Sequence, residues 1–141
     1  MGKIKFHNEY TQTLNINKKG LRQKIVDLIT LEGKMEGEIS IIFCNDDYLL
    51  KINKDFLNHD YYTDIITFNY VSNGIISGDL FVSVERVKEN AKAFNVKFIE
   101  ELERVILHGI LHLIGYDDKT TEQKEEIREK ENYYLRRLKV D

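Results

Sequence analysis

The chain has 141 residues, with 21 basic and 24 acidic side chains, a net charge of −3 and a single cysteine. This length fits one domain, and the small negative charge does not favour binding of nucleic acid through bulk electrostatics, although a local basic groove would not show in the sum. No window reaches the roughly 18 apolar residues of a membrane span, and the first residues do not resemble a signal peptide. Cys44 lies in an apolar run without a pairing partner, so we expect a core residue in a reducing cytoplasm.

In the first half of the chain, apolar periodicity and turn residues predict alternating strands and helices. Polar caps and glycines mark where these elements begin and end. In chain order the expected elements are a strand at 3–8, a helix that opens at 17–20 and is ended by Gly33 and Gly37, a strand at 38–43, and a helix that is capped by 45–47 and runs towards Phe56.

The second half combines one hairpin with three helices. Residues 64–70 are rich in β-branched and aromatic side chains, and the turn at 72–74 leads into a second strand at 75–82. Helical periodicity then predicts three helices, at 83–95, 97–114 and 121–138. The middle helix is apolar on both sides, so its end should be buried and its two histidines should emerge from the core.

These elements predict an α/β (α+β) protein that forms a single domain over residues 1–141. We expect a mixed sheet of about four strands packed by about five helices, with a metal site on the penultimate helix and its following turn. The final helix carries a dense run of charged residues between 122 and 131. We interpret this run as a solvated face with i,i+4 ion pairs and not as a binding element.

The most informative motif spans residues 108–118. His108 and His112 would lie one turn apart on the same face of a helix, so both imidazoles could bind one cation. Gly115 can adopt the positive φ that ends a helix and turns the chain back, which would let Asp118 supply a third ligand. Two nitrogens and one carboxylate oxygen leave a fourth tetrahedral position for water, which is typical of a catalytic metal site.

Other interpretations of the same residues stay open. The histidines could simply be two partly buried imidazoles with hydrogen-bonded neighbours. A zinc peptidase would carry its general base directly after the first histidine, where this chain has Gly109, and a metzincin would need a methionine after Met35. An iron oxygenase uses a formally identical set of two histidines and one carboxylate, but such enzymes usually place these ligands on strands.

The motif at 108–118 resembles the signature H-G-x-L-H-L-x-G-Y-D-H of the YbeY family, which are bacterial metal-dependent endoribonucleases involved in ribosomal RNA maturation. It matches ten of the eleven positions. Residues 52–68 resemble the family's L-N-x-x-[YF]-R-x-x-D-x-x-T-D-V-L-S-F without a gap, and residues 78–80 fall where the family has G-D-I. Because the order of elements also agrees, the resemblance covers essentially the whole chain.

Two positions depart from the family pattern. The family's third metal-binding histidine corresponds to Asp118, which lowers the net charge of the site by one and should acidify bound water less. The family's arginine, thought to contact the RNA backbone, corresponds to Leu57, which cannot replace a bidentate phosphate clamp. His59, two residues later, is a candidate to supply positive charge for RNA binding in its place.

The resemblance implies an endoribonuclease that hydrolyses phosphodiester bonds in ribosomal RNA maturation and ribosome quality control. Its partners would be ribosomal RNA and the small ribosomal subunit, with no membrane or DNA partner expected. One Zn²⁺ per chain, or another divalent metal, would be bound by His108, His112 and Asp118 and would lower the pKa of bound water. The alternative is a ribosome-associated RNA-binding metalloprotein with weak or no catalysis.

No residue is identified as the general base by sequence alone. Asp79 follows a glycine at a strand and is a candidate acid–base or orienting group, with an Asx turn as the other interpretation. Asp117 is a candidate partner for a ligand imidazole or a simple turn residue. His59 is the remaining catalytic candidate, and Tyr116 is expected to pack and not to react.

Overall fold

The computed structural model describes residues 3–10, 12–59 and 61–137. Within these ranges the chain forms four strands and five helices, which confirms the predicted number of each. In chain order they are β1 (Ile4–Asn8), α1 (Lys18–Leu31), β2 (Met35–Cys44), α2 (Asp46–Leu57), β3 (Ile65–Asn69), β4 (Ile75–Ser83), α3 (Val84–Phe94), α4 (Phe98–Ile114) and α5 (Thr121–Arg137). Leu138, the last residue of the predicted final helix, lies outside the described residues.

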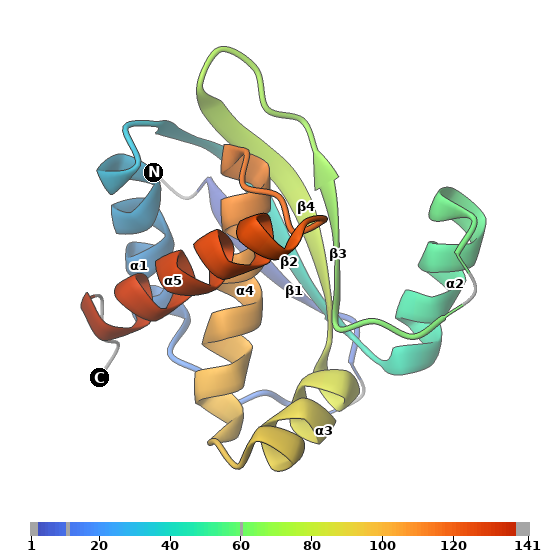
Figure 1. The fold of residues 1–141 in the computed structure, drawn as a ribbon. Helices are drawn as coiled ribbons and strands as arrows, with labels where there is room; N and C mark the ends of the chain where they lie inside the picture. The colour runs from blue at the N-terminus through green and yellow to red at the C-terminus, as the bar shows by residue number, and fades with distance from the viewer. Residues whose placement is uncertain (1–2, 11, 60, 138–141) are drawn as a thin grey trace.

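The strands form one mixed sheet in the order β1-β2-β4-β3. β1, β2 and β4 run parallel, whereas β3 is antiparallel to β4 because the two are joined by the predicted hairpin. Asn73 and Gly74 both take positive φ in that turn, as a tight hairpin requires. Helices α1 and α4 cover one face of the sheet, with α5 lying across them, and α2 stands on the other side (Figure 1).

Successive strand residues divide between two apolar clusters on the two faces of the sheet, as the period of two requires. The larger cluster lies beneath α1 and α4 and includes Leu80 and Val82 of β4. The smaller cluster lies beneath α2, where Cys44 is buried as expected. Among the described residues, no helix is long and apolar enough to cross a lipid bilayer.

Close packing of α4 on the sheet depends on Gly109. A Cβ atom at this position would lie 2.7 Å from Ile65 Cδ1 and 2.8 Å from Leu80 Cδ2, which is closer than real Cβ contacts allow. The helix therefore approaches β3 and β4 as closely as its own backbone permits. This close contact sets the distance between the sheet and the last two turns of α4, which carry the two histidines.

The prediction that Gly37 ends the first helix is wrong. Gly33 takes a positive φ of 76° after α1, and Gly37 lies inside β2. A Cβ at Gly37 would lie 2.1 Å from Ser77 Oγ on β4, and the register shifts between Glu36 and Ile39. Glycine within a strand marks such close approaches and bulges. The sequence pattern alone does not distinguish a glycine of this kind from one that ends a helix.

Candidate metal centre

The last two turns of α4 and the loop after it bring three side chains together. His108 and His112 emerge from the core with 25% and 22% of their side chains exposed, and Asp118 is 43% exposed. Gly115 ends the helix with a φ of 128°, as its place in the motif predicts, and the backbone N–H groups of Gly115 and Tyr116 donate to the carbonyl of Leu111. The chain thereby turns back towards the histidines.

The spacing of the donor atoms suits a single divalent ion. The two Nε2 atoms of His108 and His112 are 2.9 Å apart, and Asp118 Oδ2 lies 3.3 Å from the second and 3.4 Å from the first. Tetrahedral ligands at zinc–nitrogen bond lengths are separated by about 3.3 Å. The three side chains form a group that could hold a metal ion, and their chemistry of two imidazoles and one carboxylate fits zinc.

Hydrogen bonds at the opposite ring nitrogens leave both Nε2 atoms facing the group. His112 Nδ1 donates to the carbonyl oxygen of Tyr116 at 2.9 Å, and His108 Nδ1 donates to Glu131 Oε2 at 2.6 Å. A neutral imidazole that donates from Nδ1 carries its lone pair on Nε2, which is the tautomer a metal ligand needs. The contacts at Nδ1 therefore orient both rings with Nε2 towards the group, and a neutral ring in this tautomer is ready to bind an ion.

Glu131 is the supporting residue that the sequence interpretation missed. It belongs to the charged run on α5 that we interpret as a solvated face, yet its side chain is only 4% exposed. Its second oxygen accepts a hydrogen bond from Arg104 Nη1 at 3.1 Å, so this carboxylate of α5 binds two side chains of α4. A usable signal was present, because Glu131 falls on the apolar stripe of α5 between the buried residues Ile127 and Tyr134.

The surroundings also set the pKa of His108. Burial lowers it, but the hydrogen bond and negative charge of Glu131, together with the charges of Asp118 and Asp64, outweigh burial and hold the pKa of His108 above its ordinary value. The net effect shows that negative potential dominates around this ring. The same potential favours a bound cation.

A second cluster anchors the turn that follows α4. The hydroxyl of Tyr116 donates to Glu32 Oε1 at 2.6 Å, and Glu32 Oε2 also accepts from Tyr134 and from Lys130 Nζ at 3.2 Å. Burial raises the pKa of Glu32, but hydrogen bonds from both tyrosines and Lys130 outweigh it and lower the pKa below its ordinary value. Tyr116 donates to Glu32 and packs against the core here, as the expectation that it packs predicts.

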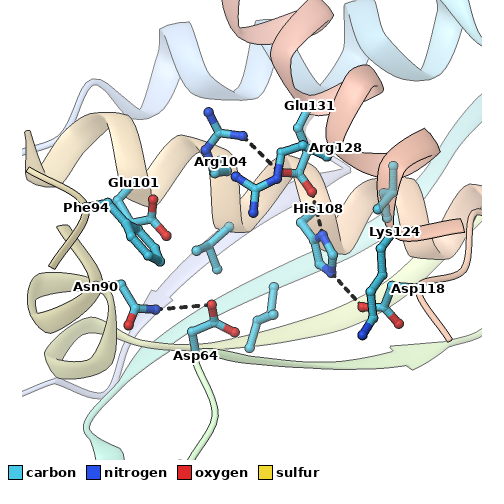
Figure 2. A pocket seen from close by; sticks show the side chains of 13 residues that line it. Asp64, Asn90, Phe94, Glu101, Arg104, His108, Asp118, Lys124, Arg128 and Glu131 are labelled. Carbon is cyan, nitrogen blue, oxygen red and sulfur yellow. Dashed lines mark hydrogen bonds and ion pairs between the residues drawn. The ribbon is translucent and has the colours of Figure 1, made fainter. Parts of the chain in front are cut away.

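An open pocket of about 310 Å³ adjoins the three side chains, with His108 and Asp118 in its lining (Figure 2). Lys124, Arg128 and Glu131 of α5 form one wall. Asp64, Asn90 and Phe94 lie at the far end of the pocket (Figure 2). Burial raises the pKa of Asp64 even though the positive charge of His108 lowers it.

The other candidates lie elsewhere. Asp79 is inside β4, paired with Phe68 and accepting a 3.3 Å hydrogen bond from the Tyr70 hydroxyl, so it is not in an Asx turn. Its neighbours on β4, Gly78 and Leu80, face α4, which places Asp79 on the opposite face of the sheet.

Asp117, His59 and Leu57 do not line the pocket either. Asp117 Oδ1 accepts a hydrogen bond from the backbone N–H of Asp118 at 3.0 Å, which is a contact within the turn. Asp117 does not orient a ligand imidazole, because the Nδ1 atoms of His108 and His112 contact Glu131 and the Tyr116 carbonyl. His59 is exposed beyond α2, stacked on Tyr61 with ring centroids 5.2 Å apart, and does not line the pocket. Leu57 ends α2 and is 39% exposed.

The geometry also bears on the peptidase interpretation. A glutamate after the first histidine would have to stand at position 109, where a Cβ atom already meets Ile65 and Leu80 within 2.8 Å. A glutamate general base at this position is therefore excluded by the packing of α4 on the sheet as well as by the sequence.

The fold and the site define a small mixed-sheet domain with a two-histidine, one-aspartate metal group at the end of a buried helix. The family model described as "Endoribonuclease YbeY" matches residues 4–139, so the chain belongs to this family. The resemblance noted from the motifs is confirmed.

Individual relatives agree over nearly full length. The chain is 49% identical to an "Endoribonuclease YbeY" of Flavobacterium johnsoniae over 98% of this chain and 99% of that protein. It is 48% identical to one of Christiangramia forsetii over 92% and 90% of the two chains. Among solved structures, the solution structure of a Thermotoga maritima protein aligns with a TM-score of 0.66 at 29% identity, covering 96% of this chain and 88% of that one.

Proposed function

We propose that this chain is a metal-dependent endoribonuclease that hydrolyses RNA phosphodiester bonds. The observation that carries this function is the group of three ligand atoms within 4.8 Å of one another beside an open pocket. Relatives that share nearly half of the sequence carry the name of an endoribonuclease, which supports RNA as the substrate. We further propose that it acts in the cytoplasm on ribosomal RNA, in association with the small ribosomal subunit, in rRNA maturation and ribosome quality control.

His108, His112 and Asp118 would hold the ion, with zinc favoured by the donor set. When bound, a divalent ion supplies an acidified water and offsets negative charge on a phosphate oxygen. The protein itself orients the ligands: Glu131 and the Tyr116 carbonyl fix the two imidazoles, and the turn from Gly115 to Asp118 returns the carboxylate. The pocket leaves open space beside His108 and Asp118, where an RNA strand can approach.

The decisive test removes one imidazole. The His112→Ala variant should lose both stoichiometric metal binding, measured by elemental analysis, and cleavage of single-stranded ribosomal RNA fragments, measured on gels. His7→Ala is the matched control, because His7 is an exposed residue of β1 outside the pocket and should keep both properties. Cleavage that survives in metal-free wild-type protein would show that the proposed mechanism is wrong.

The same experiment separates catalysis from binding. A ribosome-associated binding protein would sediment with ribosomal particles but leave RNA intact with zinc, manganese or magnesium supplied. Wild-type cleavage that is lost in His112→Ala and retained in His7→Ala contradicts that alternative. Elemental analysis of protein purified without added metal identifies the ion.

A further inference from the structure

We propose that the pocket beside the metal centre binds one unpaired nucleotide of the RNA, with its phosphate against Lys124 and Arg128 and its base stacked on Phe94. The inference rests on the proposed function, because it assigns the contacts by which the same site takes its substrate.

The size and lining of the pocket suit one nucleotide. Its volume is about 310 Å³, and His108 and Asp118 at one end place any bound group beside the metal ligands. The aliphatic residues Ile65, Val105 and Ile127 supply apolar lining. Proteins that bind RNA sequences commonly take splayed, unstacked bases into such pockets, which a base inside a duplex does not enter.

The cationic side of the pocket comes from α5. Lys124 and Arg128 lie four residues apart, so they project from the same face of the helix, and both are exposed. Within the described part of the chain the Lys124 ammonium makes no ion pair, and Arg128 approaches Glu131 only at 3.9 Å. Arg104, by contrast, is held by Glu131 at 3.1 Å. Lys124 and Arg128 are therefore the two cations of this pocket whose N–H groups are not held by a carboxylate at hydrogen-bonding distance, and they can contact a phosphate.

The opposite end of the pocket offers a stacking surface and polar groups. Phe94 is the last residue of α3 and is 60% exposed, so the core does not account for its position. Asn90, one turn earlier on the same helix, donates to Asp64 Oδ2 at a long 3.5 Å. These polar groups face the same space as the ring, and the charged side chains of α5 lie towards the metal ligands (Figure 2). An aromatic face beside hydrogen-bonding groups is the arrangement that binds an unstacked base.

The test measures RNA affinity in the metal-loaded protein by stopped-flow anisotropy, read before cleavage. The probe is a labelled single-stranded RNA of about 12 nucleotides, long enough to extend beyond one nucleotide site. Phe94→Ala should weaken binding about tenfold, whereas Phe94→Tyr should bind as the wild type does because it keeps the stacking face. A duplex of the same length should bind with an affinity that Phe94→Ala does not change.

The phosphate contact has its own signature in salt. The plot of log affinity against log salt concentration has a negative slope. In the double variant Lys124→Gln, Arg128→Gln this slope should become shallower by about 0.7, the value for one phosphate contact on a single strand. Arg136→Gln is the matched control on the same helix, because Arg136 does not line this pocket and should leave the slope unchanged. Metal content and melting temperature should be equal in all of these variants.

The outcomes separate the two proposals. If the wild type cleaves RNA but Phe94→Ala and the double variant bind it with unchanged affinity and slope, the nucleotide site is wrong and the proposed function stands. If the variants lose affinity as expected but the wild type cleaves no RNA with any divalent metal, the nucleotide site stands and the nuclease function is wrong. Equal binding of duplex and single strand, with equal losses in Phe94→Ala, would overturn the unpaired base.

Discussion

His108 and His112 lie one turn apart on α4, yet the molecule supports the two rings in different ways. His112 donates to a backbone carbonyl four residues later, in the turn that ends its own helix. His108 donates to the carboxylate of Glu131, 23 residues later on α5. The first support needs only the correct end of one helix, whereas the second needs two helices to pack in the correct register. One half of the centre is therefore local and the other half depends on tertiary structure.

The two supports also differ in charge. The Tyr116 carbonyl is a dipole, but Glu131 brings a full negative charge that is balanced by Arg104 at 3.1 Å. Removing one partner of a buried ion pair strongly destabilises the fold, because an uncompensated charge then remains in the interior. We therefore expect the metal centre to be more sensitive to changes on α5 than to changes in the turn, and the following predictions test that difference.

The largest effect is expected at Glu131. Replacing this residue in Glu131→Gln keeps a similar shape but removes the charge that orients and polarises His108 and balances Arg104. Loss of such a supporting carboxylate typically costs 10- to 100-fold in metal affinity, and we expect a decrease of about that size. Competition with a chromophoric zinc chelator measures it directly.

Glu129→Gln provides the matched control on the same helix. Glu129 is exposed, so the same chemical change should leave zinc affinity within about twofold of the wild type. Equal affinities for Glu131→Gln and the wild type would mean that the contact between α5 and His108 is not what orients the ring.

The same contrast between local and tertiary support explains which parts of the fold and the site the sequence predicts. The spacing of His108, His112, Gly115 and Asp118 predicts the ligand group because all four belong to one helix and its turn, where geometry is set by local backbone rules. The strands and helices are likewise predicted closely, since each follows from its own periodicity and caps. What the local pattern does not reveal is which element packs against which.

Glu131 shows why the sequence does not reveal the residues that support the ligands. Its neighbours in sequence are charged and exposed, and only the approach of α5 to α4 makes it a buried partner of His108. Asp79 shows the opposite case, because its place after a glycine suggests a site residue, while the register of β4 places it on the sheet face away from α4. Both depend on contacts between elements that lie far apart in sequence.

The second prediction breaks the local support. Gly115→Ala forces a side chain into a φ of 128°, a conformation that L-residues rarely adopt, and should destabilise the fold by about 1 to 2 kcal/mol. Because this residue sets the turn that carries the Tyr116 carbonyl and Asp118, zinc affinity should fall as well. Chemical denaturation and chelator competition measure the two effects.

Gly33→Ala separates strain from function. Gly33 follows another helix with a positive φ of 76°, and a Cβ there, as at Gly115, meets nothing within 4 Å. We expect a comparable loss of stability with no change in zinc affinity. If both glycine variants lost affinity equally, the effect at Gly115 would reflect general destabilisation and the local support would have no special role.

The smallest effect is expected from the anchor of the turn, and it depends on pH. The pKa of Glu32 is lowered in the folded protein, so its ionised form stabilises the fold above the unfolded pKa near 4.5. This contribution is lost as the pH falls through the lowered folded value. Glu32→Gln should therefore cost about 1 kcal/mol near pH 7, and the difference between variant and wild type should shrink below pH 4.

Urea denaturation of both proteins across this range measures the difference, and subtraction removes the acid sensitivity that they share through the metal ligands. Glu125→Gln, at an exposed position of α5, should show no pH-dependent difference from the wild type. A Glu32→Gln cost that stayed constant down to pH 3 would mean that the tyrosine hydrogen bonds act independently of the charge on Glu32. The hydrogen bonds of Tyr116 and Tyr134 would then hold the turn without help from the charge of Glu32, and that charge would contribute nothing to the local support of His112.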